Sequence, residues 1–327
     1  MNAVVLCLLS FCCLGHAAWA ADDGAAFQKK LKERITASEK RLSELEAQII
    51  AAEGTPEQAK LLFAQAKGYD DLAEAQYQLA LERGVTKAFD APELVESRKK
   101  AIIVLDRILQ NHAKHFDVAK ALLLRARQNR HLGRYEDLAR DLQTILVKHP
   151  KSQSVDDALM LLGDYYFDRT NLVNAKKLYQ QLELHPKSPL LSYARYKLAW
   201  VAINGKDFQR AAELFVKVAN APTPKGSRAK TQGNLRLQAL KDLVFCITEV
   251  MPPEKTLAYF QKLKLSRAEE LQVLPALARR LWIKEHARAA LAVYEHLISL
   301  ADNELDRKDW KEQAEQIQKF LTTHPEK

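Results

Sequence analysis

The chain has 327 residues and a formal net charge of +9, with 47% apolar residues but only 10 glycines and 11 prolines. This apolar content is sufficient for a hydrophobic core and excludes a largely disordered chain. Ala, Leu, Lys, Glu, Gln and Arg dominate and favour helices, whereas residues that favour strands are sparse. The composition therefore predicts an all-α protein.

The first 20 residues contain no charged side chain. They form an apolar stretch that ends in Ala18-Trp19-Ala20, a pattern typical of signal-peptidase sites, and polar residues follow at 21–24. We predict a signal peptide at 1–20 that is cleaved after Ala20, so that the mature chain lies outside the cytoplasm. The alternative is an uncleaved membrane anchor, because about 18 apolar residues can just span a bilayer.

The cysteines and the charges further limit which classes of protein the chain can belong to. Three of the four cysteines lie in the first 20 residues, so the mature chain keeps Cys246 and can form no internal disulfide. Cys246 lies in an apolar helical run, which predicts a buried, inert thiol. Lys and Arg are spread along the chain, which favours solvated helix faces. The alternative is attraction to acidic partners or anionic envelope surfaces. Nucleic acid is not predicted as a partner.

Residues 21–53 are predicted to form a coiled-coil-like helix. Apolar residues recur there at the a and d positions of three heptads. They are Leu31, Ile35, Leu42, Leu45 and Ile49. Two alternatives follow: the helix forms a homo-oligomer through residues 27–50, or it folds back on the same chain.

An internal repeat is the main signal. The tetrapeptide His-Pro-Lys-Ser at 149–152 recurs at 185–188. Between the copies lie a Leu-x2-Leu-Gly-x2-Tyr pattern at 159–166 and an Ala-x3-Tyr pattern at 175–179. This is the spacing of the tetratricopeptide repeat, with Leu in the tryptophan position. The small residues Gly163 and Ala175 would let two antiparallel helices approach closely.

Six registered copies of the second-helix residue can be aligned. They are Leu105, Leu142, Tyr179, Phe215, Phe260 and Tyr294. Their successive spacings are 37, 37, 36, 45 and 34, close to the repeat period of about 34 residues. We therefore predict about six helical hairpins over residues 54–300, stacked as a right-handed α-solenoid. The spacing of 45 predicts an insertion loop at 220–233, which is either a tolerated surface loop or a contact loop. Residues 301–327 are predicted to form a capping helix.

Catalytic and metal-binding patterns were sought and not found. The sequence contains no phosphate-binding Gly-rich loop, HExxH, CxxC or GxSxG motif. His112 and His115 lack further ligands nearby that would complete a metal site. We therefore predict a protein that is not an enzyme and holds no cofactor and no metal.

The first helix of each hairpin lines the concave face of a tetratricopeptide solenoid, so its outward positions predict a protein-binding groove. Aromatic and Arg residues are typical of such interfaces. The candidates are Arg127, Arg130, Asp164, Phe167, Tyr193, Tyr196, Trp200, Lys241, Arg279 and Trp282. The large apolar members indicate either a peptide groove or packing from a neighbouring hairpin. Tyr193, Tyr196 and Trp200 would form one continuous aromatic surface.

The repeats resemble the tetratricopeptide family over about residues 70–300. Residues 194–200 (Ala-Arg-Tyr-Lys-Leu-Ala-Trp) are similar to bacterial envelope members. Residues 234–244 resemble gliding-motility-type proteins of deltaproteobacteria. The resemblance implies a non-enzymatic periplasmic scaffold that binds other envelope proteins or peptides, as a subunit of an envelope-spanning machine. The peptide clamp of chaperone-binding members is not reproduced, because Arg127, Asp164 and Trp200 occupy equivalent positions.

Two other functions remain open. A periplasmic coordinator of cell division or outer-membrane assembly also joins a coiled coil to tetratricopeptide repeats. An accessory superhelical domain of a cell-wall enzyme system is a third reading, although no residues remain for a catalytic domain. In each case contact with the membrane is expected only transiently, through the signal segment, unless that segment stays uncleaved.

Overall fold

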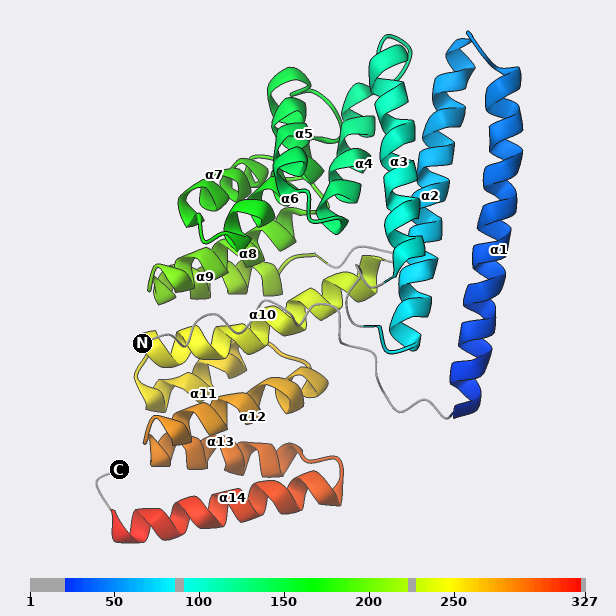
Figure 1. The fold of residues 1–327 in the computed structure, drawn as a ribbon. Coiled ribbons are helices and arrows are strands. Elements are labelled where there is room, and N and C mark those ends of the chain that lie inside the picture. The colour runs from blue at the N-terminus through cyan, green and yellow to red at the C-terminus, as the bar shows by residue number, and fades with distance from the viewer. Residues whose placement is uncertain (1–20, 86–90, 223–227, 325–327) are drawn as a thin grey trace. The chain divides into compact units, whose positions relative to one another are not determined.

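The computed structural model describes residues 21–85, 91–222 and 228–324. Over these residues the chain forms fourteen α-helices and no β-strand (Figure 1). The chain divides into two compact units, residues 1–170 and 171–327. The predicted all-α class is confirmed, and helices pack in sequence within each unit as in an α-solenoid. The signal peptide predicted at 1–20 lies outside the described residues.

Six helices belong to unit 1, and each packs against the next along the chain (Figure 1). They are α1 (Ala21–Ala51), α2 (Pro56–Glu82), α3 (Pro92–Asn111), α4 (Val118–His131), α5 (Tyr135–Lys148) and α6 (Val155–Asp168). No helix in the described part of the chain is long and apolar enough to cross a membrane.

Eight helices belong to unit 2, where α8, α9 and α10 pack consecutively and α10 also packs on α12. They are α7 (Leu172–Glu183), α8 (Leu191–Asn204), α9 (Phe208–Ala219), α10 (Arg228–Val250), α11 (Pro253–Lys262), α12 (Arg267–Ile283), α13 (Ala287–Leu300) and α14 (Glu304–Thr323). The last helix, α14, packs on α13 and buries Trp310, Ala314 and Ile317. It therefore covers the apolar face that α13 would otherwise expose.

The aligned second-helix residues are buried within their own units. One of them lies on each of α3, α5, α7, α9, α11 and α13, and each is at most 3% exposed. A position that is buried in every copy is what a helical repeat requires, because each hairpin contributes one large side chain to a continuous core. The burial agrees with the register read from the sequence.

The turns that join paired helices share one backbone conformation. A residue with a left-handed φ lies nine positions before the aligned core residue in four copies. These residues are Gly133 (70°), Thr170 (58°), Lys206 (60°) and Glu285 (63°). In three of these turns the next amide bonds back into the preceding helix, as when Asp207 N donates to Ala202 O at 2.9 Å. Gly205, which precedes Lys206 in this turn, has a φ of −82° and caps the end of α8.

The helix α1 packs against α2 within the same chain. Four of its heptad residues are buried there: Leu31, Leu42, Leu45 and Ile49. The side chain of Gln58 on α2 donates to Ile49 O at 3.2 Å and closes one end of the pair. The second alternative, a helix folded back on its own chain, is therefore the arrangement found.

The pairing of α1 with α2 depends on a close approach at Gly68. A Cβ atom added to Gly68 would lie 2.9 Å from Leu42 Cδ2. We expect Gly68→Val to destabilise this pair by about 1–3 kcal/mol, because the added methyl groups must displace α1. Hydrogen exchange in residues 24–51 should become faster. Gly233→Val is the control, because nothing lies within 4 Å of a Cβ at Gly233; equal effects would contradict the prediction.

The insertion predicted as a loop at 220–233 is partly wrong, because residues 228–233 are helical. They form the first turns of α10, which has 23 residues where α4, α6 and α8 have 14 each. Arg228, Lys230 and Gln232 favour helix, and the open surroundings of Gly233 allow the helix to continue through it. The extra residues therefore lengthen a helix rather than only a loop.

Candidate functional site

In unit 1 the groove candidates separate into two exposed and two buried residues. Arg127 and Arg130 are exposed on α4, and Arg127 Nη2 lies 2.6 Å from Asp157 Oδ1. Asp164 and Phe167 on α6 are only 6% and 9% exposed, so the prediction that they face the groove is wrong. The reason is that α6 is apolar around most of its circumference and buries several faces.

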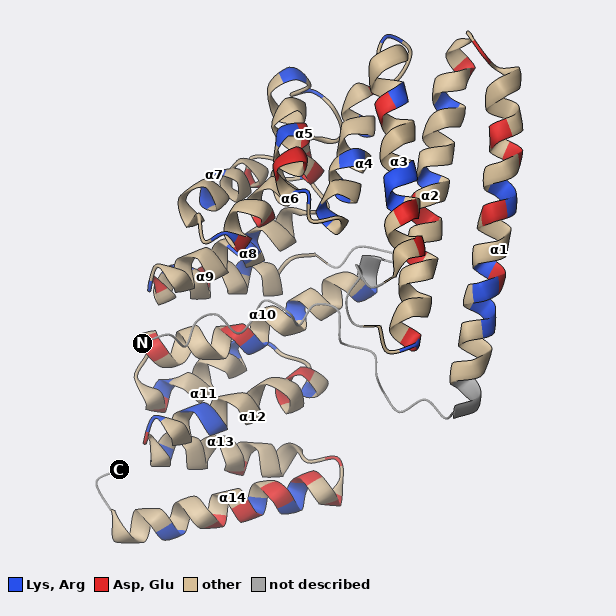
Figure 2. Cartoon of the chain, in the orientation of Figure 1, with Lys and Arg blue, Asp and Glu red and all other residues tan. Residues whose placement is uncertain are grey.

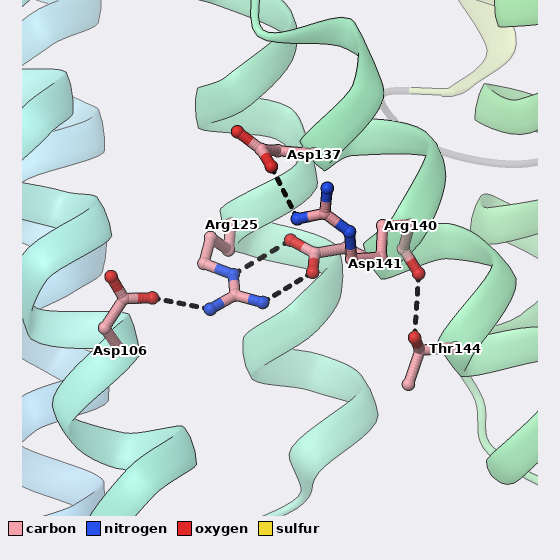
Figure 3. Close-up of polar contacts among 6 residues, drawn as sticks. All are labelled: Asp106, Arg125, Asp137, Arg140, Asp141 and Thr144. Atoms are coloured by element: carbon pink, nitrogen blue, oxygen red, sulfur yellow. Dashed lines mark hydrogen bonds and ion pairs between the residues drawn. The ribbon is translucent and has the colours of Figure 1, made fainter.

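A partly buried ion-pair network joins α3, α4 and α5 (Figure 3). Arg125 on α4 donates to both carboxylate oxygens of Asp141 on α5, at 2.9 and 2.5 Å. It also donates to Asp106 on α3 at 2.5 Å. Burial acts to lower the pKa of Arg125, but the two carboxylates outweigh it and raise that pKa. This network connects three helices, and the Arg125 guanidinium is fully engaged by the two carboxylates.

A second network lies deeper in unit 1. Arg98 on α3 is 3% exposed. Its Nη1 donates to Gln128 Oε1 at 2.9 Å and to Asp70 Oδ1 at 3.3 Å. Gln128 Nε2 in turn donates to Asp70 Oδ1 at 2.9 Å. Each of these three side chains thus has a hydrogen-bonding partner within the network, which is the condition for burying charge in a stable fold. Sequence reasoning missed both networks.

In unit 2 the aromatic residues of α8 form a cluster. Tyr196 is 8% exposed, whereas Tyr193 and Trp200 are partly exposed. The Tyr193 and Tyr196 rings stack with their centroids 6.4 Å apart. Phe215 lies beneath, 5.6 Å from the Tyr196 ring and 6.4 Å from the Trp200 ring. The continuous aromatic surface predicted from sequence is therefore divided: Tyr193 and Trp200 are accessible, and Tyr196 supports them. We call Tyr193, Tyr196 and Trp200 together the α8 aromatic surface.

The α8 aromatic surface rests on Asp242, a residue that the sequence analysis missed. The hydroxyl of Tyr196 donates to Asp242 Oδ2 at 2.7 Å, and Gln238 Nε2 donates to Oδ1 at 3.1 Å. Burial raises the pKa of Asp242 to about 6. The one available signal was an acidic residue inside the apolar run 240–247 of α10.

The remaining candidates lie on α10 and α12. Lys241 is partly exposed, and Arg279 is exposed with its Nε donating to Pro275 O of its own helix. Trp282 packs edge-to-face on Phe320 of α14, with centroids 5.1 Å apart. For Trp282 the alternative of packing from a neighbouring element is therefore the one found, because α14 covers this end of the unit.

Phe245 was not among the candidates, although its position on α10 corresponds to that of Trp200 on α8. Its ring meets Phe208 edge-to-face at 5.5 Å, and the Arg280 guanidinium lies 4.2 Å from its centroid. Figure 2 shows charges of both signs on most helices. The helices α4 and α8 differ from this pattern, because each carries basic residues but no acidic residue.

Unit 2 also contains a shallow hollow of about 420 Å³ between α9, α10 and α11. Its lining is mainly apolar and consists of Gln209, Ala212, Glu213, Val216, Lys217, Ile247, Val250, Met251 and Tyr259. This hollow lies largely on second helices of the pairs, away from the face that carries the groove candidates.

Catalytic chemistry finds no support in the described residues. No group of three His, Cys, Asp or Glu among them could hold a metal ion. Burial raises the pKa of the Cys246 thiol to about 12, so the reactive thiolate is scarce at neutral pH. Cys246 is fully buried in α10, which agrees with the inert thiol predicted from its apolar surroundings.

Comparison with known proteins identifies the repeat. Residues 157–188 and 193–222 match the tetratricopeptide repeat family. The matched segments contain α6 with α7 and α8 with α9, and the second includes the whole α8 aromatic surface. The tetratricopeptide repeat predicted from spacing is thereby supported for these segments.

Two solved structures match this chain at low identity. One is BtubC (BKLC) from P. vanneervenii, at 11% identity over 89% of this chain and 92% of that one, with a TM-score of 0.43. The other is yeast Tom70, at 14% identity over 96% of this chain and 67% of that one, with a TM-score of 0.41. No curated protein matches the sequence. At these identities and TM-scores the two structures say nothing about a ligand.

Proposed function

We propose that this chain is a non-enzymatic protein–protein interaction scaffold of the bacterial cell envelope, acting as a periplasmic subunit of an envelope-spanning machine. The binding surface is the first-helix face of unit 2, centred on the α8 aromatic surface. The observation that carries this proposal is the accessibility of Tyr193 and Trp200, two turns apart on a helix that contains no acidic residue.

The chemistry of this face suits a peptide segment. Aromatic side chains supply a large contact area at a small entropic cost, and they are frequent at the centres of interfaces. Here the rings of Tyr196 and Trp200 are already packed on Phe215 and Tyr193 stacks on Tyr196, so little ordering is needed on binding. Lys197 lies 5.7 Å from the centre of the Tyr193 ring and adds positive charge beside it.

The test is capture from envelope extract with wild-type protein, followed by binding measurements with each purified partner. We expect Trp200→Ala to weaken binding at least about tenfold, because it removes a central aromatic contact. Arg127→Ala examines the corresponding face of unit 1. Arg140→Ala is the control, because Arg140 is exposed on a second helix. Equal affinity of all four proteins for every partner would overturn the groove as the binding surface.

Export and oligomerisation are separate parts of the proposal. If the signal segment is cleaved as predicted, mass spectrometry of the protein from the periplasm will find an amino terminus at Ala21. A homo-oligomer through residues 27–50 stays a prediction. Because α2 covers the heptad residues of α1, such an oligomer would use the outer, charged face of α1. Light scattering on the purified protein measures its mass directly.

A further inference from the structure

Asp242 connects two consecutive repeats at the site that we propose for binding. It belongs to α10, whereas the side chains it supports belong to α8. Its carboxylate accepts from Tyr196 at 2.7 Å and from Gln238 at 3.1 Å, and Trp200 is a further hydrogen-bonding neighbour. Tyr196 in turn stacks on Tyr193 and packs on Phe215, which also carries Trp200. The Asp242 carboxylate therefore contacts Tyr196 directly and is linked to Tyr193 and Trp200 through the packing of the rings.

We propose that Asp242 is a positioning residue: its carboxylate holds Tyr196, and through Tyr196 the accessible rings of Tyr193 and Trp200, and protonation of that carboxylate loosens the hold. An ionised carboxylate accepts hydrogen bonds from all of its donors at once. A protonated carboxyl must itself donate, so one neighbouring donor has to turn away or change its role. The proposal rests on the proposed function in one respect only, namely that the α8 aromatic surface binds a partner.

The direction of the effect follows from burial. Burial raises the pKa of Asp242 to about 6, above the value of about 3.9 for an exposed Asp. The fold therefore favours the protonated form of Asp242. This form contributes to the stability of the fold below about pH 4, and the contribution is lost as the pH rises through about 6. The hold on Tyr196 by the ionised carboxylate is gained over the same range.

Few other groups can titrate beside Asp242. On α8 the neighbouring groups are Tyr193 and Tyr196, and burial raises the pKa of Tyr196. On α10 Lys241 lowers the pKa of Asp242, and burial raises the pKa of Cys246.

The helices packed against α10 also bring charged groups. On α9 the charges of Arg210, Glu213 and Lys217 are exposed. On α12 Arg280 is paired with Glu249 at 2.6 Å. None of α8, α9, α10 and α12 carries a histidine.

The experiment uses the full chain labelled with 5-fluorotryptophan and follows the Trp200 resonance by fluorine NMR from about pH 4.5 to about pH 8. The resonance is assigned with Trp200→Phe. We expect its shift to follow a single-proton curve with a midpoint near pH 6. Asp242→Asn, which keeps an acceptor for Tyr196, should give a folded protein whose Trp200 resonance does not titrate. Tyr196→Phe should titrate with a higher midpoint, because the ionised carboxylate loses a donor.

Two controls accompany these variants. Glu213→Gln removes an exposed acid of α9 and should leave the curve unchanged. The Trp310 resonance of α14 should not show this midpoint. A Trp200 resonance that does not titrate in the wild-type protein, or that titrates equally in Asp242→Asn, would overturn the proposal. Neither result depends on a partner, so failure of the proposed function in the capture experiment is a separate outcome.

Discussion

Replacing Arg98 by alanine is expected to destabilise unit 1 by about 3–5 kcal/mol. Arg98 is 3% exposed and bonds to both Asp70 and Gln128. Its removal leaves Gln128, which is fully buried, with an unpaired amide oxygen and leaves Asp70 without its cation. Removing a buried charged partner costs this much chiefly because Gln128 cannot regain water, whereas Asp70 is 37% exposed and can.

The measurement is chemical denaturation combined with hydrogen exchange. Exchange should become faster in α2, α3 and α4, which the Arg98 network connects, and should change little in α12 and α13. Arg127→Ala is the matched control, because Arg127 is an exposed arginine with an ion pair at 2.6 Å. Its removal should cost less than about 1 kcal/mol. A similar loss in the free energy of unfolding for both variants would show that the burial of Arg98 does not increase its contribution to stability.

Replacing Phe215 by alanine is expected to destabilise unit 2 by about 3–5 kcal/mol. The Phe215 side chain is fully buried, and its ring supports both Tyr196 and Trp200. The substitution leaves a cavity beneath the α8 aromatic surface that neighbouring helices can fill only in part. The loss should therefore reach the binding face as well as the core.

Hydrogen exchange can locate this effect, with faster exchange expected in α8, α9 and α10. Phe208→Ala is a useful comparison, because Phe208 is only partly buried at the start of α9. It should cost clearly less than Phe215→Ala. If the two variants unfold at the same denaturant concentration, Phe215 is not the core residue that the repeat register implies.

The core of each repeat was predictable because helical periodicity is local. Residues from Leu105 to Tyr294 could be aligned by spacing alone, and every aligned position is buried. Hydrophobic side chains that recur at one point of a hairpin must face the same seam, whichever repeat carries them. The inserted residues before α10 were harder to place, because turn-forming and helix-forming residues alternate there and propensity alone did not decide between loop and helix.

The candidate site was only partly predictable. Outward register selected Arg127, Tyr193 and Trp200, which are partly or fully exposed in the structure. The position of a residue in the repeat could not show that Asp164 and Phe167 are buried. Their burial depends on which other elements pack against α6. Asp242 was missed for the same reason: its bond to Tyr196 joins residues 46 positions apart.

The sequence by itself determined the helical class, the repeat and the set of residues that point inward, because these follow from short-range spacing along a helix. Tertiary structure alone decided that α1 folds back on α2, that Arg98 and Arg125 are neutralised by carboxylates from other helices, and that Asp242 supports the α8 aromatic surface. These features depend on pairs such as Asp70 and Gln128, which are 58 residues apart in the chain. Only packing brings such residues within bonding distance.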